Sequence, residues 1–194
     1  KGGDTVEKTA VQKLAGALKV LVTITLVCNL VALLLVPGMS LMKGPEELLA
    51  LTPYENPLEV PLRVGIAFVL SWGWVWTAGV YEVVLALFLL FCGICTAVIL
   101  WQGRRVLGTI LTGAPFRAEN GVSLRRAAVC CFLIAAAALA RVVWGLFYYG
   151  SVAPLLTYNA LFVPIFILGG LLCLVMSALF RQAAELKAEN DLTI

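Results

Sequence analysis

Residues 78–102 read AGVYEVVLALFLLFCGICTAVILWQ and are followed, after one glycine, by the pair Arg104 and Arg105. Glu82 is the single charged side chain in this stretch, and most of the others are aliphatic or aromatic. About 20 consecutive apolar residues suffice for a helix to cross the hydrocarbon core of a bilayer. The stretch therefore predicts a transmembrane helix, and the arginine pair marks the end at which it leaves the membrane.

Three further apolar stretches have the length of membrane spans, at about residues 18–39, 127–149 and 155–180. The first is longer than the core of a signal peptide and lacks a small-residue cleavage site, so we interpret it as an anchor. Of the 194 residues, 62% are hydrophobic and 13% are charged, which leaves too few polar side chains to cover a water-soluble domain. The sequence predicts an all-α integral membrane protein, a four-transmembrane-helix bundle that forms a single domain over 1–194.

The segment between the first two spans, about residues 40–77, is the outer loop of this prediction. Within it, residues 43–63 contain four of the eight prolines and four glutamates, which lipid would not tolerate. In its second half, Trp72, Trp74 and Trp76 alternate with other residues, a period of two that favours extended structure. Tryptophan also favours the membrane–water boundary. We expect an extended or β-hairpin segment at about 58–77, with a fifth, re-entrant segment as the alternative.

Basic residues are distributed unevenly between the two sides of the predicted bundle. The N-terminal segment, the central loop at about 103–126 and the tail 181–194 carry eleven of them. The opposite side carries Lys43 and Arg63. Because lysine and arginine concentrate in cytoplasmic loops, we expect both termini and the central loop in the cytoplasm. The eleven are Lys1, Lys8, Lys13, Lys19, Arg104, Arg105, Arg117, Arg125, Arg126, Arg181 and Lys187.

Two charged residues fall inside predicted spans, where each costs about 2.5–3.5 kcal/mol near the membrane centre. Counted along the helices from the arginines at their inner ends, Glu82 and Arg141 both fall in the outer half of the bilayer. We expect them to pair, with Asn159 or Tyr158 of the fourth span nearby. The pair would be a structural clasp, or an ion, proton or ligand site; alternatively, the two side chains do not meet. Asn29, in the first span, is expected to form an interhelical hydrogen bond.

All six cysteines fall within apolar stretches. Cys92 and Cys95 form a C-x-x-C pair, as in the four-span membrane enzymes of disulfide formation. The reactive pair of those enzymes faces the oxidising compartment, whereas Cys95 precedes Arg104 by nine residues and falls in the inner half of the membrane. Thiolates are disfavoured in such apolar surroundings, so packing is the favoured interpretation. The chain has no histidine, the commonest general base and metal ligand, and we expect no enzymatic activity, cofactor or metal site.

Two segments on the predicted cytoplasmic side resemble the signatures of a known family. Residues 113–120 read GAPFRAEN, residues 124–126 read LRR, and residues 179–194 read LFRQAAELKAENDLTI. They resemble the patterns G-x-PF-x-x-EN…LR and F-R-x-x-x-E-L-x-x-E-N-D-L-T-[VI] of the bacterial membrane family catalogued as domain of unknown function 2975. The motif residues considered for partner binding are Pro115, Phe116, Glu119, Asn120, Arg125, Arg126, Phe180, Arg181, Glu185, Leu186, Glu189, Asn190, Asp191 and Leu192.

The resemblance implies a bacterial inner-membrane protein that holds or controls a small helix-turn-helix regulator at the cytoplasmic face, without binding nucleic acid itself. The tail offers a physical basis, because Leu179, Ala183, Leu186 and Asn190 share one side of a helix. Its acidic residues could meet a basic DNA-reading surface. Alternatively, the tail is merely solvated or folds back on the arginines of the central loop.

Two other functions remain open from the sequence. One is a small transport, ligand-sensing or immunity-type membrane protein that uses the region of Glu82 and Arg141. The other is a membrane thiol oxidoreductase that uses Cys92 and Cys95. A homo-oligomer in the lipid bilayer is compatible with each of these hypotheses.

Overall fold

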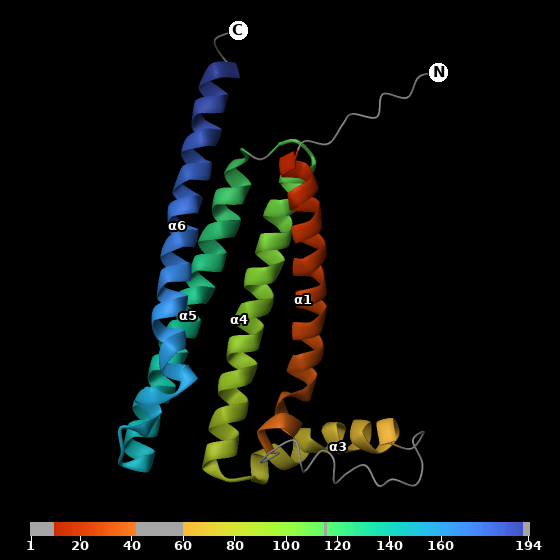
Figure 1. Ribbon diagram of the computed structural model, residues 1–194, viewed down its shortest axis with the longest axis vertical. Coiled ribbons are helices and arrows are strands. Elements are labelled where there is room, and N and C mark those ends of the chain that lie inside the picture. The colour runs from red at the N-terminus through yellow and green to blue at the C-terminus, as the bar shows by residue number, and fades with distance from the viewer. Residues whose placement is uncertain (1–9, 42–59, 115, 192–194) are drawn as a thin grey trace. The chain divides into compact units, whose positions relative to one another are not determined.

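The computed structural model describes residues 10–41, 60–114 and 116–191, which form helices and short turns (Figure 1). The predictions that fall on residues 42–59, on Pro115 and on Leu192 lie outside this part of the chain. In chain order, the elements are α1 (Ala10–Leu41), α3 (Val60–Trp74), the 3-10 turn η1 (Val75–Thr77), α4 (Val80–Leu111), α5 (Ala118–Tyr149), the 3-10 turn η2 (Ala153–Leu156) and α6 (Tyr158–Asp191).

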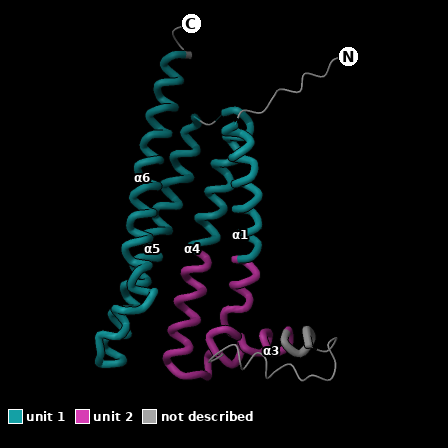
Figure 2. The backbone as a smooth tube through the Cα atoms, in the orientation of Figure 1, with its two compact units in different colours: residues 1–28, 95–194 teal, residues 29–94 magenta. Residues whose placement is uncertain are grey.

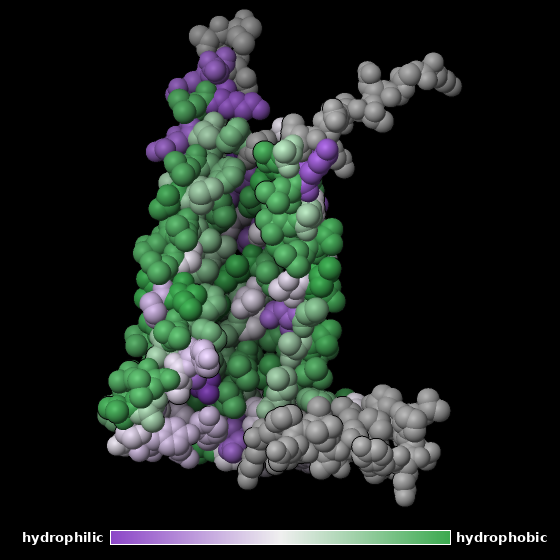
Figure 3. Space-filling view, viewed as in Figure 1, coloured by the Kyte–Doolittle hydropathy of each residue, from purple (hydrophilic) through white to green (hydrophobic). Residues whose placement is uncertain are grey.

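Four of these helices, α1, α4, α5 and α6, are long and apolar enough to cross a membrane. The mean hydropathy of their most apolar stretches lies between 2.2 and 3.0. Large apolar side chains are exposed along them, such as Leu168 at 61% and Leu172 at 66% on α6, which suits contact with lipid rather than water. On α6, hydrophilic residues gather toward the C-terminal end (Figure 3). The chain is therefore a multi-pass membrane protein with four candidate spans, as the sequence predicted.

The structure does not confirm the extended or β segment that we predicted for residues 58–77. The helix α3 and the turn η1 occupy the part of it that is described, and no strand occurs in the described ranges. The three tryptophans lie where α3 tightens into η1; all are exposed, whereas Val75 between them is buried. Tryptophan at the membrane interface can lie on any side of a helix. The spacing of the tryptophans by two residues was therefore not evidence for a strand. With 15 residues, α3 is apolar but shorter than a membrane span.

The described chain groups into two compact units (Figure 2). Unit 2, residues 29–94, contains the second half of α1, α3, η1 and the first half of α4. Here Asn29 Nδ2 donates a hydrogen bond to Gly93 O at 2.9 Å, which joins α1 to α4. The Leu33 side chain occupies the space beside Gly93, 2.5 Å from the position that a Cβ atom would take. The organisation of 1–194 as one domain stays a prediction.

Pro37 interrupts the hydrogen-bond ladder of α1, because proline has no N–H group to donate. Two side chains bond to backbone carbonyls in this region. The Ser40 hydroxyl donates to Pro37 O at 2.8 Å, and Trp72 Nε1 of α3 donates to Leu34 O at 3.1 Å. Proline is tolerated in a membrane helix where side chains bond to the backbone carbonyls near it.

Unit 1, residues 1–28 and 95–194, contains the remaining halves of α1 and α4 together with α5, η2 and α6. The helices α5 and α6 pack along one another, and α5 buries mainly small side chains. A Cβ atom at Gly170 of α6 would lie 2.9 Å from the ring of Phe132 on α5. Small residues of this kind let transmembrane helices approach closely. Gly150, at a φ of 59°, ends α5 in the left-handed conformation that glycine adopts readily.

We predict that Asn29→Ala lowers the free energy of unfolding by about 0.6–1.7 kcal/mol, the range for an interhelical hydrogen bond in a membrane protein. Thr25→Ala is the matched control, because the Thr25 hydroxyl bonds only to Leu21 O in its own helix. Unfolding of the purified chain in mixed detergent micelles measures both. Equal losses in the two variants would contradict a role for the Asn29–Gly93 bond.

Candidate functional site

The end of α4 is fixed by a turn that uses Gly113. The amide of Gly113 donates to Ile110 O and that of Ala114 to Thr109 O, each at 3.1 Å. Gly113 has a φ of 74°, in the left-handed region. This pair of bonds around a left-handed glycine is the Schellman motif, which satisfies the last carbonyls of a helix. The glycine of the GAPF segment therefore sets where α4 stops and directs the chain toward α5.

Asn120 links the start of α5 back to α4. Its side chain is 2% exposed, and Nδ2 donates to the Thr109 hydroxyl at 2.7 Å. The Thr109 hydroxyl in turn donates to Val106 O at 2.7 Å. The N-cap of α5 is Arg117, in an extended conformation and without a capping side chain. In place of a side-chain cap, the start of α5 thus has a hydrogen bond between helices, which fixes the spacing of α4 and α5 at this end.

The start of α5 also packs against α6. The Ser177 hydroxyl donates to Gly121 O at 2.7 Å. A Cβ atom at Gly121 would lie 3.0 Å from Ser177 O and 2.7 Å from Cγ of Arg181. The rings of Phe116 and Phe180 lie with centroids 6.4 Å apart. The two motif segments, far apart in sequence, therefore meet at the end of unit 1 where α5 begins.

The comparison with protein families matches residues 52–194, which include both motif segments and their junction, to the family described as protein of unknown function (DUF2975). The chain belongs to this family. No curated protein and no solved structure matches it. The description of the DUF2975 family states no activity.

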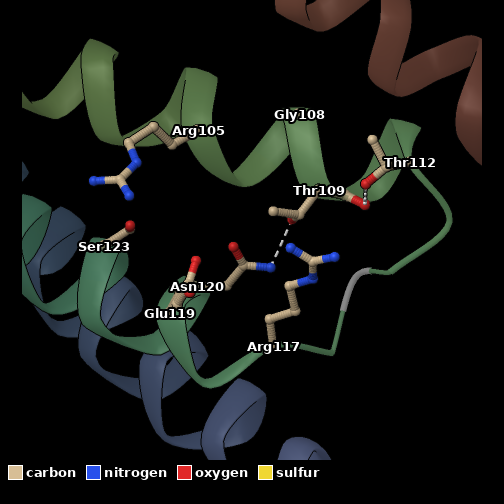
Figure 4. A pocket seen from close by; sticks show the side chains of 8 residues that line it. All are labelled: Arg105, Gly108, Thr109, Thr112, Arg117, Glu119, Asn120 and Ser123. Atoms are coloured by element: carbon tan, nitrogen blue, oxygen red, sulfur yellow. Dashed lines mark hydrogen bonds between the residues drawn. The ribbon is translucent and has the colours of Figure 1, made fainter.

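In this DUF2975 protein, a cavity of about 270 Å³ lies between α4 and the start of α5. Figure 4 shows Arg105 on one side of Asn120 and Arg117 on the other, with the Asn120–Thr109 hydrogen bond between the two helices. The lining combines two guanidinium groups, one carboxylate and several neutral hydrogen-bonding groups. The lining residues are Arg105, Gly108, Thr109, Thr112, Arg117, Glu119, Asn120 and Ser123.

Several lining residues were missed from the sequence. Arg105 was interpreted only as a mark of orientation, and Gly108 and Thr109 were not considered. Gln102 was treated as the end of a span, yet it is buried, and its Oε1 atom has no hydrogen-bond partner among the described residues. The signal that could have found them is a polar stripe at helical spacing that continues along α4 past Gln102 to Thr109.

The polar residues within the spans lie in different units. In unit 1, Arg141 Nη1 of α5 donates to Asn159 Oδ1 of α6 at 3.3 Å, and the neighbouring Tyr158 is exposed. In unit 2, the Glu82 carboxylate lies beside Gly79 at the N-terminus of α4, where the positive end of the helix dipole favours a negative charge. The pairing of Glu82 with Arg141 stays a prediction.

The cysteines of unit 1 contact one another between helices. The Cys95 thiol of α4 lies within hydrogen-bonding range of Cys130 on α5, and Cys131 of α5 lies similarly close to Cys173 of α6. None of the six cysteines forms a disulfide. Cys95 therefore takes part in helix packing as a small apolar residue.

We predict that Gly121→Ala lowers the free energy of unfolding by about 1–3 kcal/mol, because the new methyl group must push apart the backbones of α5 and α6. Gly103→Ala on α4 is the matched control, since its Cβ atom would meet nothing within 4 Å. This control should raise stability by up to about 1 kcal/mol, the helix propensity difference. Detergent unfolding distinguishes the opposite signs; a gain of stability in Gly121→Ala would contradict the close approach.

If Glu82 and Arg141 pair, we predict that the single reversals Glu82→Arg and Arg141→Glu each destabilise the fold by about 3 kcal/mol, because each would then place like charges together in an apolar setting. The double reversal should recover most of this loss if the two side chains pair. The folded fraction after extraction from membranes measures the effect. Additive losses in the double variant would show that the two residues do not meet.

Proposed function

We propose that this protein is a non-enzymatic regulator that holds a small helix-turn-helix transcription factor at the cytoplasmic face of the bacterial inner membrane. The observation that carries the proposal is the extension of α6, a continuous helix from Tyr158 to Asp191. It continues past Arg181, beyond the region where it packs against the start of α5 (Figure 1). The extension thus presents a helical surface outside the apolar spans.

The junction of the two motifs supports the extension at its base. The Ser177–Gly121 hydrogen bond, the close approach of Gly121 to Arg181 and the contact between the two phenylalanine rings all lie at this point. Motif residues in the central segment therefore position the tail without having to contact the partner. The two motif segments, although distant in the sequence, would then share one structural role, the positioning of the tail.

The extension has the chemistry of a helix that docks on a basic partner. Leu186 is 66% exposed, and Glu185 and Glu189 are exposed on the same helix. With one lysine, Lys187, against three acidic residues between positions 182 and 191, the extension carries a net negative charge. An acidic helix with an apolar residue complements the DNA-reading surface of a helix-turn-helix protein, which is basic because it binds phosphates. Docking there would keep the regulator from DNA.

The intramembrane polar residues do not favour a second function. The Arg141–Asn159 hydrogen bond joins α5 to α6, an ordinary role for a polar side chain between transmembrane helices. The regulator hypothesis therefore carries the functional proposal.

Site-specific photocrosslinking tests the proposal, with the photoreactive residue at Leu186. Leu172 is a matched control, because it is also 66% exposed on α6 but lies within the apolar span. In native membranes, position 186 should crosslink a small DNA-binding protein and position 172 only lipid. The same products at both positions, or a product at 186 that binds no DNA, would contradict the proposal.

Removal of residues 182–194 should release the regulator from the membrane fraction into the cytosol while the four spans remain inserted. Glu185→Gln combined with Glu189→Gln should slow association severalfold and reduce its dependence on salt, because charges at the rim of an interface act mainly on the association rate. Continued membrane retention of the regulator after the truncation would eliminate the role of the tail.

A further inference from the structure

The cavity between α4 and α5 adjoins a second one. The second cavity has a volume of about 280 Å³ and is lined by Lys19, Trp101, Arg104, Arg105 and Gly108. It shares Arg105 and Gly108 with the first. Each volume is slightly below the range of about 300–1,000 Å³ in which proteins bind small molecules. The pair therefore suits a small polar group rather than a large ligand.

The charge of the lining is positive. Arg105 and Arg117 line the first cavity against the single carboxylate of Glu119, and the second cavity adds Lys19 and Arg104. Within the described part of the chain, the guanidinium groups of Arg105 and Arg117 form no ion pair or hydrogen bond, and Arg117 accepts one only through its backbone carbonyl, from Asn120 N at 3.0 Å. Guanidinium groups with free donors match the oxygen atoms of a phosphate, which they bind through two parallel hydrogen bonds. The excess of cations favours an anion over a metal ion.

A neutral donor completes the lining of the first cavity. Ser123 contributes a hydroxyl group from α5, whereas the Thr112 hydroxyl already donates to Thr109 O at 3.0 Å. Hydroxyl groups of this kind bond to phosphoryl oxygens without adding charge. The Asn120–Thr109 hydrogen bond holds the two helices that carry the arginines at a fixed separation. The arginines are thus presented from two elements that are joined to one another.

Trp101 indicates the depth of the site in the membrane. It is half exposed at the end of the apolar stretch of α4, and the Arg104 guanidinium lies 5.9 Å from the centre of its ring. Tryptophan and arginine at the end of a span mark the level of the lipid headgroups. Basic pockets between transmembrane helices at this level hold anionic headgroups.

We propose that these adjoining cavities form a binding site for a phosphoryl group, supplied by the headgroup of an anionic lipid or by free phosphate. Arg105, shared by both cavities, is the central ligand, and Arg117 and Lys19 approach the group from its two sides. Glu119 opposes the negative charge and limits the affinity. The site is separate from the α6 extension, so it does not rest on the proposed regulator.

The test uses the purified full chain in detergent and in phosphatidylcholine nanodiscs. Native mass spectrometry measures retention of phosphatidylglycerol against phosphatidylcholine, and thermal unfolding in the nanodiscs measures stabilisation by inorganic phosphate at constant ionic strength. Preferential retention of phosphatidylglycerol assigns the site to a lipid headgroup, whereas stabilisation by inorganic phosphate assigns it to free phosphate. If neither probe binds, the proposal is overturned.

Variants locate the binding. Arg105→Gln and Arg117→Gln should each weaken it about fivefold, the effect of one basic residue near an anionic surface. Gly108→Leu should also weaken it by filling the shared space without changing the charge. Glu119→Gln should strengthen it severalfold, an outcome that a folding defect does not produce. Arg126→Gln is the control, an exposed arginine on α5 outside both cavities; a loss there equal to that of Arg105→Gln would overturn the proposal.

Removal of residues 182–194 separates this proposal from that of the regulator. The truncated chain should bind the phosphoryl probe as the full chain does, whether or not the tail recruits a DNA-binding protein. Loss of phosphoryl binding on truncation would count against a site formed by α4 and α5.

Discussion

Every peptide group within the hydrocarbon core must find its hydrogen-bond partner in the protein, because lipid offers none. This constraint explains the long helices α1, α4, α5 and α6, which satisfy the backbone within each segment. Where Pro37 interrupts α1, Ser40 and Trp72 supply donors to the carbonyls around it. Once the backbone is satisfied, the few polar side chains that remain in or near the spans can join one helix to another. Asn29 and Ser177 both do so by donating to a glycine carbonyl on a neighbouring helix.

Small residues turn these hydrogen bonds into a specific arrangement. Gly93 and Gly121 each accept a bond through the backbone, and at each position a side chain from the partner helix fills the space that a Cβ atom would need. The donor and the glycine act together, because the bond is short only if the backbones can approach. At the start of α5 this arrangement brings together both signature segments of the DUF2975 family. The same end of unit 1 holds the two basic cavities. The start of α5 both packs against α6 and lines the first of these cavities.

Hydropathy alone was sufficient to predict four spans, because lipid imposes the same requirement on every residue of a span. The segment at 58–77 could not be predicted in this way. The membrane interface favours a depth for tryptophan but not a particular side of a helix, so the spacing of the tryptophans does not reveal the secondary structure. The motif residues Phe116, Asn120 and Phe180 were recognised, but their contacts were not. Asparagine is a residue type that often caps helices, so the sequence does not predict that Asn120 bonds to α4. Its contact with Thr109 depends on the turn at Gly113, which sets how far α4 extends. Cavities likewise depend on where a helix ends, which pattern reasoning places only within a few residues.

The continuity of α6 has a mechanical consequence. From Arg181 to Asp191 the helix extends about 15 Å, at 1.5 Å per residue, and it shares one axis with the apolar part that follows Pro164. Transmembrane helices change their tilt when the bilayer thins or thickens. The embedded and projecting parts belong to one continuous helix, so a change of tilt in the embedded part also displaces the projecting part sideways.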